Sequence, residues 1–460
     1  MKALRARLSA VSQSDEGFTL IEVIVALMIF AIVAVGIGYS LTSVLVLTRD
    51  GRSREVAIGL AAESIDDARS IEDIFTIESQ DPTDATDHTV RSVDGVDYYI
   101  VRVAKWVTST NSDAQCGAAG GVTVGGSFEF KRINVTVTWN GMRPGSLPVR
   151  SDTLIAPNKR INEENKGTIL VSVQLASGRG AAGLAVTATP ASTNPNGAAA
   201  ITVPILATDE EGCTYILKVV PGNYTITLTK LGWIDDGQNS PASKTISVAA
   251  DGSTAVGFQF DQAATYKLNF GDATTALKPT NFNVSFTNTY GDKVVTNPAA
   301  GGTALHPFTV GYQAIAGDPN DAVPTNLGCE SPDPANWPAR AGDGALGIRS
   351  EAASAAPGAT ATVPIGMGMI TVPNVNGSYI TAVSEATGPN GDPGCAQQVK
   401  YFFGKMSTAN PVIALPFGSW RIYKSSDSTL GSDMSGLLPV APIGTVSGKV
   451  VTLDPRVVLP

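Results

Sequence analysis

Histidine and cysteine are scarce in this chain of 460 residues, which contains two histidines and four cysteines. His88 follows Thr86-Asp87 and His306 precedes Pro307, and we expect both to lie in exposed turns or loops. The cysteines are far apart in sequence and form no CxxC pair or Cys/His cluster with the spacing of zinc ligands. The sequence therefore predicts neither a metal site nor a catalytic histidine.

Charged residues are also few, at 16% of the chain against about 25% in a typical globular protein. The net charge of -9 gives the chain no general attraction to nucleic acid, so no nucleic-acid partner is expected. The sequence has no phosphate-binding loop, no nucleophile elbow and no histidine constellation. We expect a protein without enzymatic activity and without a cofactor.

Apolar and turn-forming residues, by contrast, are abundant. Hydrophobic residues make up 43% of the chain, and there are 47 glycines and 28 prolines. This apolar content excludes wholesale disorder, and the length suggests about three folded units rich in turns.

The longest apolar run lies near the N-terminus, from Phe18 to Leu47, and contains one charged residue, Glu22. As a helix it would span about 45 Å, enough to cross a membrane. A secretory signal with a cleavage site near Ala34-Val35-Gly36 is one alternative, although the apolar run continues beyond it. An uncleaved signal anchor is another. Because a carboxylate in lipid is costly without a partner, Glu22 is predicted to be functional.

The residues around the start of this run resemble a known signal. Gly17-Phe18-Thr19-Leu20-Ile21-Glu22 follows a short leader with Lys2, Arg5 and Arg7, and resembles the class III signal of type IV prepilins. The resemblance implies a leader of residues 1–17, cleaved between Gly17 and Phe18 by a prepilin peptidase, and N-methylation of Phe18. It also implies that Glu22 pairs with the freed amine of a neighbouring subunit. Many pilins have a proline within the apolar helix, whereas the first proline here is Pro82.

The pilin resemblance implies a domain of residues 18–157, and the sequence shows its parts. The membrane helix, 18–47, is followed by a proline-free segment, 48–75, with an apolar stripe of Ile58, Ala61, Ala62, Ile65 and Ala68. Residues 76–157 then contain alternating segments, Tyr99 to Val103 and Ile133 to Trp139, that predict antiparallel strands. We expect a long helix packed on a small sheet.

Two β-rich regions follow a polar linker at residues 158–166. Residues 167–261 contain several alternating segments and resemble the immunoglobulin-like sandwiches of the carboxypeptidase-regulatory-like and Cna-B families. Some members of those families cross-link lysine to asparagine, but Thr168–Leu175 contains no lysine for such a bond. The fold class expected is α+β, with a pilin domain followed by two all-β sandwich-like modules.

The second accessory β domain is predicted at residues 262–460, where no helical period is sustained. Its segment Leu415–Trp420 is similar in sequence to Val220–Tyr224 in the preceding region. Each is predicted to form a turn that places an aromatic side chain in the core of a sandwich. Trp337, Met367, Met369 and Trp420 are candidates for ligand contact, with core packing as the alternative. The aspartates of the turn Asp318–Asp321 suggest a calcium loop, but the turn lacks the 12-residue calcium-loop pattern and is predicted to be solvated.

Export would place the four cysteines in an oxidising compartment, where they would form disulfides. Four cysteines allow three pairings. We favour a bridge between Cys329 and Cys395, with Cys116 and Cys213 as the second candidate pair.

Taken with the resemblance, these features predict a minor type IV pilin, located at the tip of a surface filament or present in low abundance. Such a subunit spans the bacterial cytoplasmic membrane once before assembly and is displayed on the cell surface afterwards. Its expected partners are other pilin subunits, a prepilin peptidase, the membrane, the pilus or secretion assembly machinery and a surface ligand. The alternatives are a minor pseudopilin of type II secretion, a DNA-uptake pilin and a membrane-anchored surface enzyme.

Overall fold

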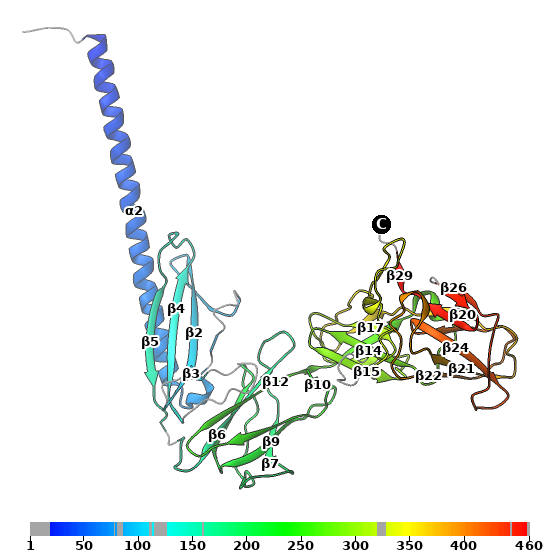
Figure 1. Ribbon diagram of the computed structural model, residues 1–460. Coiled ribbons are helices and arrows are strands. Elements are labelled where there is room, and N and C mark those ends of the chain that lie inside the picture. The colour runs from blue at the N-terminus through cyan, green and yellow to red at the C-terminus, as the bar shows by residue number, and fades with distance from the viewer. Residues whose placement is uncertain are drawn as a thin grey trace, which may run out of the picture. The chain divides into compact units, whose positions relative to one another are not determined.

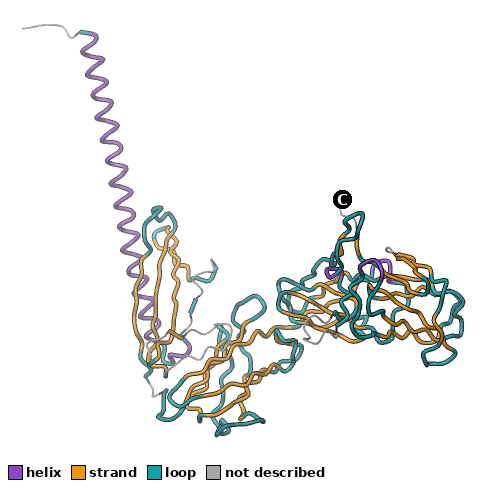
Figure 2. The backbone as a smooth tube through the Cα atoms, viewed as in Figure 1, coloured by secondary structure: helices purple, strands orange, loops and turns teal. Residues whose placement is uncertain are grey.

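The computed structural model describes residues 19–77, 79–80, 86–109, 113–114, 127–158, 161–319, 328–441 and 444–457. The chain divides into two compact units. The first comprises Met1–Val107 and Glu129–Lys159, and the second comprises Thr108–Phe128 and Arg160–Pro460. The fold is α+β, because one long helix is followed by many β-strands (Figures 1 and 2).

The first unit begins with helix α2, Leu20–Ser70, which is continuous over 51 residues. Thr19 caps its N-terminus, since the Thr19 side chain accepts a hydrogen bond from the Glu22 backbone N–H. The helix ends at Ser70, five residues before the predicted boundary, and the short 3-10 helix η1, Ile74–Thr76, follows. Gly36 and Gly38 do not break the helix, so the two predicted segments form one rod.

A five-stranded sheet packs beside the C-terminal half of α2 (Figure 1). Its strands are β1 (Thr89–Val93), β2 (Val96–Thr108), β3 (Asp113–Ala114), β4 (Phe128–Trp139) and β5 (Val149–Ile155), in the order β1-β2-β4-β5 with β3 paired to β2. Asp94 and Gly95 have positive φ and form the tight turn between β1 and β2. Along β4, Ile133, Val135 and Val137 are completely buried, which gives the sheet its apolar face.

The buried stripe of α2 differs in part from the predicted one. Ala61, Ile65 and Ala68 are buried as expected, but Ile58 is 54% exposed and Ala62 is also exposed. Ala57 and Leu60 are buried instead. The stripe is therefore rotated relative to the prediction, because the sheet covers the face that carries Ala57 and Leu60 and leaves Ile58 outside the contact.

Hydrogen bonds fix the helix to strand β5 and to the loop that precedes it. The Arg54 guanidinium donates to the Leu147 carbonyl at 3.3 Å, and that of Arg69 donates to Thr153 Oγ1 at 2.7 Å. Arg54 and Arg69 are 15 residues apart, about four turns of helix, so a long stretch of the C-terminal part of α2 is held against the sheet.

The second unit contains a β-sandwich formed by two sheets. The strands are β6 (Gly167–Gln174), β7 (Val186–Pro190), β8 (Cys213–Val219), β9 (Gly222–Leu228), β10 (Trp233–Asp235), β11 (Ala242–Val248) and β12 (Ser253–Gln262). One sheet has the order β10-β12-β6-β8, with β12 parallel to β6, and the other has the order β11-β9-β7. Alternating residues such as Val171, Ile226 and Phe260 fill the core between the sheets.

The C-terminal part of the second unit is also built of strands, as predicted. They are β13 (Ala264–Asn269), β14 (Asn283–Asn288), β15 (Gly291–Thr296), β16 (Thr303–Leu305), β17 (Gln313–Ala316), β18 (Leu346–Gly347), β19 (Thr360–Pro364), β20 (Gly368–Thr371), β21 (Tyr379–Ser384), β22 (Lys400–Lys405), β23 (Val412–Leu415), β24 (Gly418–Ser425), β25 (Ser432–Asp433), β26 (Leu438–Ala441), β27 (Gly444–Ser447), β28 (Val450–Leu453) and β29 (Arg456–Val457). Three short 3-10 helices lie between them: η2 (Gly271–Thr274), η3 (Pro334–Asn336) and η4 (Pro389–Gly391).

This C-terminal part has two hydrophobic cores, where the sequence suggested one domain. Met369 belongs to the first core and Ile370, the next residue on β20, belongs to the second. Because successive side chains of a strand point to opposite faces, the three-stranded sheet β23-β20-β26 separates the two cores. The larger sheet, β22-β21-β24-β28-β27 with β25 paired to β24, contributes Ala382, Ile422 and Val451 to the second core.

The two aromatic turns noted in the sequence have the same local geometry. Gly222 and Gly418 both have positive φ and both begin a strand. Tyr224 lies two residues later and donates its hydroxyl hydrogen to the Val220 carbonyl at 2.8 Å. Trp420 occupies the equivalent position and donates its indole N–H to the Pro416 carbonyl at 2.9 Å. Both rings are buried, so the predicted delivery of an aromatic side chain into a core occurs twice.

Candidate assembly site

The N-terminal half of α2, Leu20 to Leu47, presents apolar side chains to the surroundings on all sides. Leu20, Phe30 and Val35 are at least 70% exposed, and every residue of this half is exposed. At 1.5 Å per residue the segment is about 42 Å long. By length and composition it is able to cross a membrane. Such a surface is stable only when lipid or other apolar helices surround it.

Two threonine hydroxyls in and next to this half donate hydrogen bonds to their own helix. Thr42 Oγ1 donates to the Tyr39 carbonyl at 2.9 Å, and Thr48 Oγ1, just beyond the apolar run, donates to the Val44 carbonyl at 2.8 Å. A hydroxyl satisfied in this way costs little in an apolar medium. Glu22 is the one charged side chain of this half, and a charge costs far more than a hydroxyl in an apolar medium.

Glu22 lies in the first turn of α2, where the backbone N–H groups give the helix a partial positive charge. Its side chain is exposed, and it makes no ion pair with any residue in the described ranges. Helix polarity alone contributes about 0.3–1 kcal/mol, far less than the cost of placing a carboxylate in lipid. Helix polarity alone therefore does not offset the cost of placing the Glu22 carboxylate in lipid.

Gly17 and Phe18, the predicted sites of cleavage and methylation, lie outside the described residues, as do Lys2, Arg5 and Arg7. Thr19 is the first described residue, and the helix begins directly after it, at Leu20. Gly36 and Gly38 are described, and a Cβ added at either position would meet no atom within 4 Å. Both glycines therefore leave open helix surface at which a second helix is able to approach closely.

A polar cavity of about 130 Å³ lies between α2 and the strands β1 and β2. Glu63 and Asp67 line it from the helix, and Arg91 and Arg102 line it from the strands. Arg91 forms a surface ion pair with Glu63 at 3.6 Å. Because charged side chains line it and Arg91 and Glu63 pair within it, we interpret the cavity as a structural crevice of the helix–sheet contact.

The sequence candidates for ligand contact in the C-terminal part are buried. Trp337, Met367, Met369 and Trp420 have between 1% and 6% of their surface exposed. Trp337 donates its indole N–H to the Ser331 carbonyl at 2.8 Å and packs near the Arg456 guanidinium, 5.1 Å from the ring centre. These side chains contribute to packing, which was the alternative interpretation.

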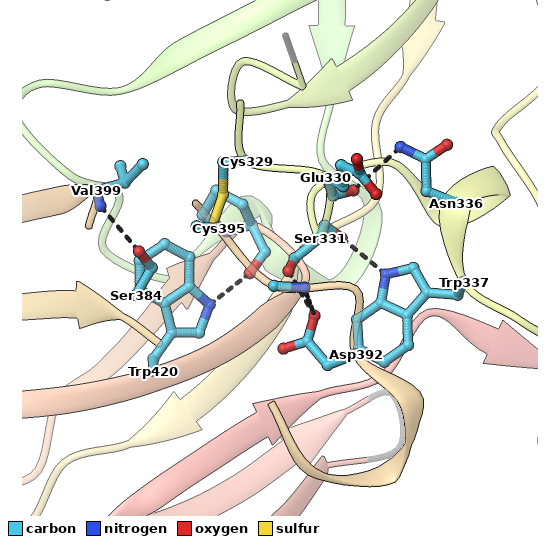
Figure 3. The surroundings of a disulfide bond; sticks show 12 residues. Cys329, Glu330, Ser331, Asn336, Trp337, Ser384, Asp392, Cys395, Val399 and Trp420 are labelled. Carbon is cyan, nitrogen blue, oxygen red and sulfur yellow. Dashed lines mark hydrogen bonds between the residues drawn. A yellow bond between two sulfur atoms is a disulfide. The ribbon is translucent and has the colours of Figure 1, made fainter. Parts of the chain in front are cut away.

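A disulfide joins Cys329 to Cys395, the pair favoured by the sequence analysis (Figure 3). Nearby, Ser331 donates to Asp392 and the Gly394 backbone N–H donates to the same carboxylate oxygen at 3.0 Å. Cys213 is also disulfide-bonded. Its candidate partner, Cys116, lies outside the described residues.

The prediction for His306 is wrong, because this residue is completely buried. His88 is partly exposed and lies edge-on to the Tyr99 ring at 4.9 Å. The burial of His306 could not be predicted from the residues around it, since its neighbour Pro307 is typical of exposed turns. Only the packing of distant strands places this imidazole in the interior.

The candidate calcium turn is described only up to Pro319, and Asn320 and Asp321 lie outside the described part. Burial raises the pKa of Asp318, and the nearby Asp292 raises it further. Within the described ranges, no group of three or more histidine, cysteine, aspartate or glutamate side chains is arranged to hold a metal ion.

Comparison with known families identifies the N-terminal segment. Residues 13–38 match the model of the prokaryotic N-terminal methylation motif, a range that includes Gly17, Phe18 and Glu22. No curated protein matches the sequence. The chain is prepilin-like at its N-terminus, and β-rich accessory domains follow.

Three solved structures are similar in part. The Bacillus anthracis TIE protein has 11% identity, and the alignment covers 82% of this chain and 71% of that protein. A streptococcal ancillary pilin has 10% identity with coverage of 51% and 75%, and the major pilin subunit of Bacillus cereus has 11% identity with coverage of 60% and 96%. The TM-scores are 0.19, 0.19 and 0.18, which are too low to carry an argument about fold or function.

Proposed function

We propose that the protein is a minor type IV pilin, a structural subunit that enters a surface filament through α2 and displays its β modules outside. The observation that carries the proposal is the methylation motif at residues 13–38 on a fully exposed apolar helix. In this proposal the chain is anchored in the cytoplasmic membrane by residues 18–47 before assembly. Its partners are a prepilin peptidase, other pilin subunits and the assembly machinery.

Processing would create the partner that Glu22 lacks. Cleavage between Gly17 and Phe18 leaves an amine on Phe18, which N-methylation keeps basic. Glu22 of one subunit then pairs with this amine on its neighbour. In an apolar medium a pair of opposite charges is strongly attractive, whereas a shifted subunit leaves both charges unpaired. The pair therefore sets the axial position of each subunit in the filament.

The size of the chain beyond α2 supports a low-abundance or tip position. A compact fold of about 390 residues has a radius of gyration of about 21 Å. Packed helices are only about 8–10 Å apart. If every subunit of a helical core carried such a head, the heads would crowd. A rare subunit, or one at the tip, avoids this conflict.

The domain boundaries belong to the same proposal. We assign residues 18–157 to the pilin domain, 158–166 to a linker, 167–261 to the sandwich and 262–460 to the second accessory domain. Separate hydrophobic cores support the division between the last two, since the sandwich core and the two C-terminal cores share no residue.

The test replaces Glu22 by alanine in the full-length chain and measures its amount in filaments sheared from the cell surface. We expect Glu22→Ala to lower incorporation by at least about tenfold, because the amine of the neighbour loses its counter-charge. Glu55→Ala is the matched control, since Glu55 is an exposed glutamate of the same helix outside the apolar run. Its incorporation should equal that of the wild type.

Mass spectrometry of the filament protein gives a second readout. The mature chain is expected to begin at Phe18 with one added methyl group on its amine. A mature chain that begins at Met1, or equal incorporation of the Glu22→Ala and wild-type proteins, would refute the proposal.

A further inference from the structure

A ring of three hydrogen bonds joins two distant segments of the second unit. Gln238, in the turn after β10, donates its side-chain N–H to Tyr312 Oη at 2.8 Å. Tyr312 Oη donates to the His306 carbonyl at 2.9 Å, and the His306 backbone N–H donates to Gln238 Oε1 at 2.8 Å. Gln238 comes from the sandwich, whereas His306 and Tyr312 come from the C-terminal part. We call this contact the Gln238 latch.

The side chain of His306 lies beneath the latch in an apolar setting. None of its surface is exposed, and neither ring nitrogen has a hydrogen-bond partner in the described part of the chain. Its ring packs against Phe308, with ring centres 4.5 Å apart. A neutral imidazole is tolerated here at the cost of one unpaired N–H. An imidazolium would add a net charge and a second unpaired donor.

The charged groups that face His306 are the carboxylates of Asp236, Asp261 and Asp235. None of them forms a hydrogen bond to the ring, and two are already engaged. Asp235 accepts from the Asn239 backbone N–H at 2.6 Å, and Asp261 accepts from that of Ala176 at 3.0 Å. The carboxylates attract an imidazolium from a distance but cannot solvate it in the closed arrangement.

The other titratable groups near His306 are tyrosines. Tyr312 closes the latch, and Tyr266 packs edge-on to Tyr312 with ring centres 4.9 Å apart. Burial raises the pKa of both hydroxyls above the usual value of 10, so both stay neutral through the physiological range. His306 is therefore the group of this contact that changes charge between about pH 8 and pH 5.

We propose that the Gln238 latch is acid-sensitive: protonation of His306 releases the Gln238 side chain and opens the contact between the turn after β10 and the segment from His306 to Tyr312. The driving force is the hydration that an imidazolium gains on opening. The released surface is aromatic, because Gln238 bonds the buried Tyr312, whose ring adjoins that of Phe308, and Phe308 packs against His306. Acidification would thus uncover an apolar patch between the sandwich and the C-terminal part.

The direction of the pH effect follows from burial. Burial lowers the pKa of His306 below its usual value of 6.5, and the three aspartates oppose this only in part. A group whose pKa is lowered in the closed form favours that form when it is neutral. The closed latch is therefore fully stable above about pH 6.5 and loses stability as the pH falls below that value.

The test is hydrogen exchange of the full-length protein in detergent micelles at about pH 7.5 and about pH 5, corrected for the intrinsic effect of pH. The His306 backbone N–H reports the latch directly, because its acceptor is Gln238. We expect its exchange to be severalfold faster at the lower pH, because protonation of the buried His306 ring favours the open latch. Peptides from β4 should be unaffected.

Three variants separate the cause from a general loss of structure. His306→Phe keeps an apolar ring that cannot be protonated, so the exchange should be slow at both pH values. Gln238→Ala removes the latch itself, so the exchange should be fast at both. His88→Phe changes the other histidine of the chain, which lies in the first unit, and should respond to pH like the wild type.

Two outcomes would overturn the proposal. One is equal protection of the His306 amide at both pH values in the wild type. The other is a pH response that persists in His306→Phe, which would assign it to the aspartates. If His306→Phe does not fold, the comparison of Gln238→Ala with the wild type still decides whether the low-pH state is the open latch.

Discussion

Lys131 on β4 is a charged residue that the first unit buries almost completely, with 3% of its surface exposed. Its ammonium donates to the Ile74 carbonyl at 3.1 Å and to the Ile77 carbonyl at 2.8 Å. These carbonyls belong to the segment around η1, which turns the chain from α2 toward the sheet. One lysine therefore satisfies the backbone acceptors of a turn that has no strand to pair with.

Replacing Lys131 by methionine is expected to destabilise the first unit by about 2 kcal/mol. Methionine fills a similar volume but leaves the two carbonyls without their lysine donor, and each buried unpaired group costs about 1–3 kcal/mol. Thermal unfolding of the full-length protein measures the change. Lys105→Met on β2, where the side chain is only partly buried, is the control and should change the midpoint little. Equal midpoints for both variants would contradict this account of Lys131.

At the scale of the element, the turns that begin β9 and β24 have the same local structure, although they belong to two different hydrophobic cores. In each, a glycine with positive φ starts the strand, and the aromatic residue two positions later bonds back to a carbonyl four residues before it. Tyr224 Oη also accepts a hydrogen bond from the Ala199 backbone N–H at 3.1 Å, and the Ala199 carbonyl, also at 3.1 Å, shares the hydroxyl hydrogen with Val220. Its hydroxyl thus ties the long connection between β7 and β8 to the sandwich.

Removal of that hydroxyl in Tyr224→Phe should cost about 1–3 kcal/mol, since the Val220 carbonyl and the Ala199 backbone groups lose a buried partner. Urea unfolding followed by tryptophan fluorescence measures the loss as a lower midpoint with an unchanged slope. Tyr290→Phe is the matched control. The Tyr290 side chain is 64% exposed and stacks on Phe308, so its hydroxyl faces solvent and its removal should be neutral.

For the molecule as a whole, the C-terminal part is closed by long-range links. The Cys329–Cys395 disulfide joins residues 66 positions apart. Near it, Arg456 is almost fully buried and donates to the carbonyls of Pro338 and Asn390 as well as to Asp454. The last described strand, β29, also pairs with β18. Residues near the C-terminus thus hold the long segment that carries Trp337.

Replacing both Cys329 and Cys395 by serine is expected to lower the free energy of unfolding of the second unit by about 4 kcal/mol. The bridge closes a loop of 66 residues, and the expected stabilisation is the chain entropy that such a loop removes from the unfolded state. Calorimetry of the full-length double variant tests this, with the transition of the first unit as an internal reference. An unchanged transition for the second unit would show that the bridge contributes nothing to stability.

Local patterns in the sequence determined several features without help from the fold. The apolar run, the position of Glu22 within it and alternating segments such as Ile133 to Val137 can each be recognised from neighbouring residues in the sequence. A membrane helix or a half-buried strand is specified by such short-range order. The cap at Thr19 and the turn at Asp94-Gly95 are local in the same sense.

Other features were decided by the tertiary structure alone. The sheet buries Ala57 and Leu60 and leaves Ile58 exposed, although helical spacing alone is compatible with either face of α2. The division of the C-terminal part into two cores by β20, and the burial of His306, depend on the pairing and packing of strands distant in sequence. Sequence periodicity indicates which residues share one face of a helix or strand. Which strand or helix packs on that face depends on contacts with residues far away in the sequence.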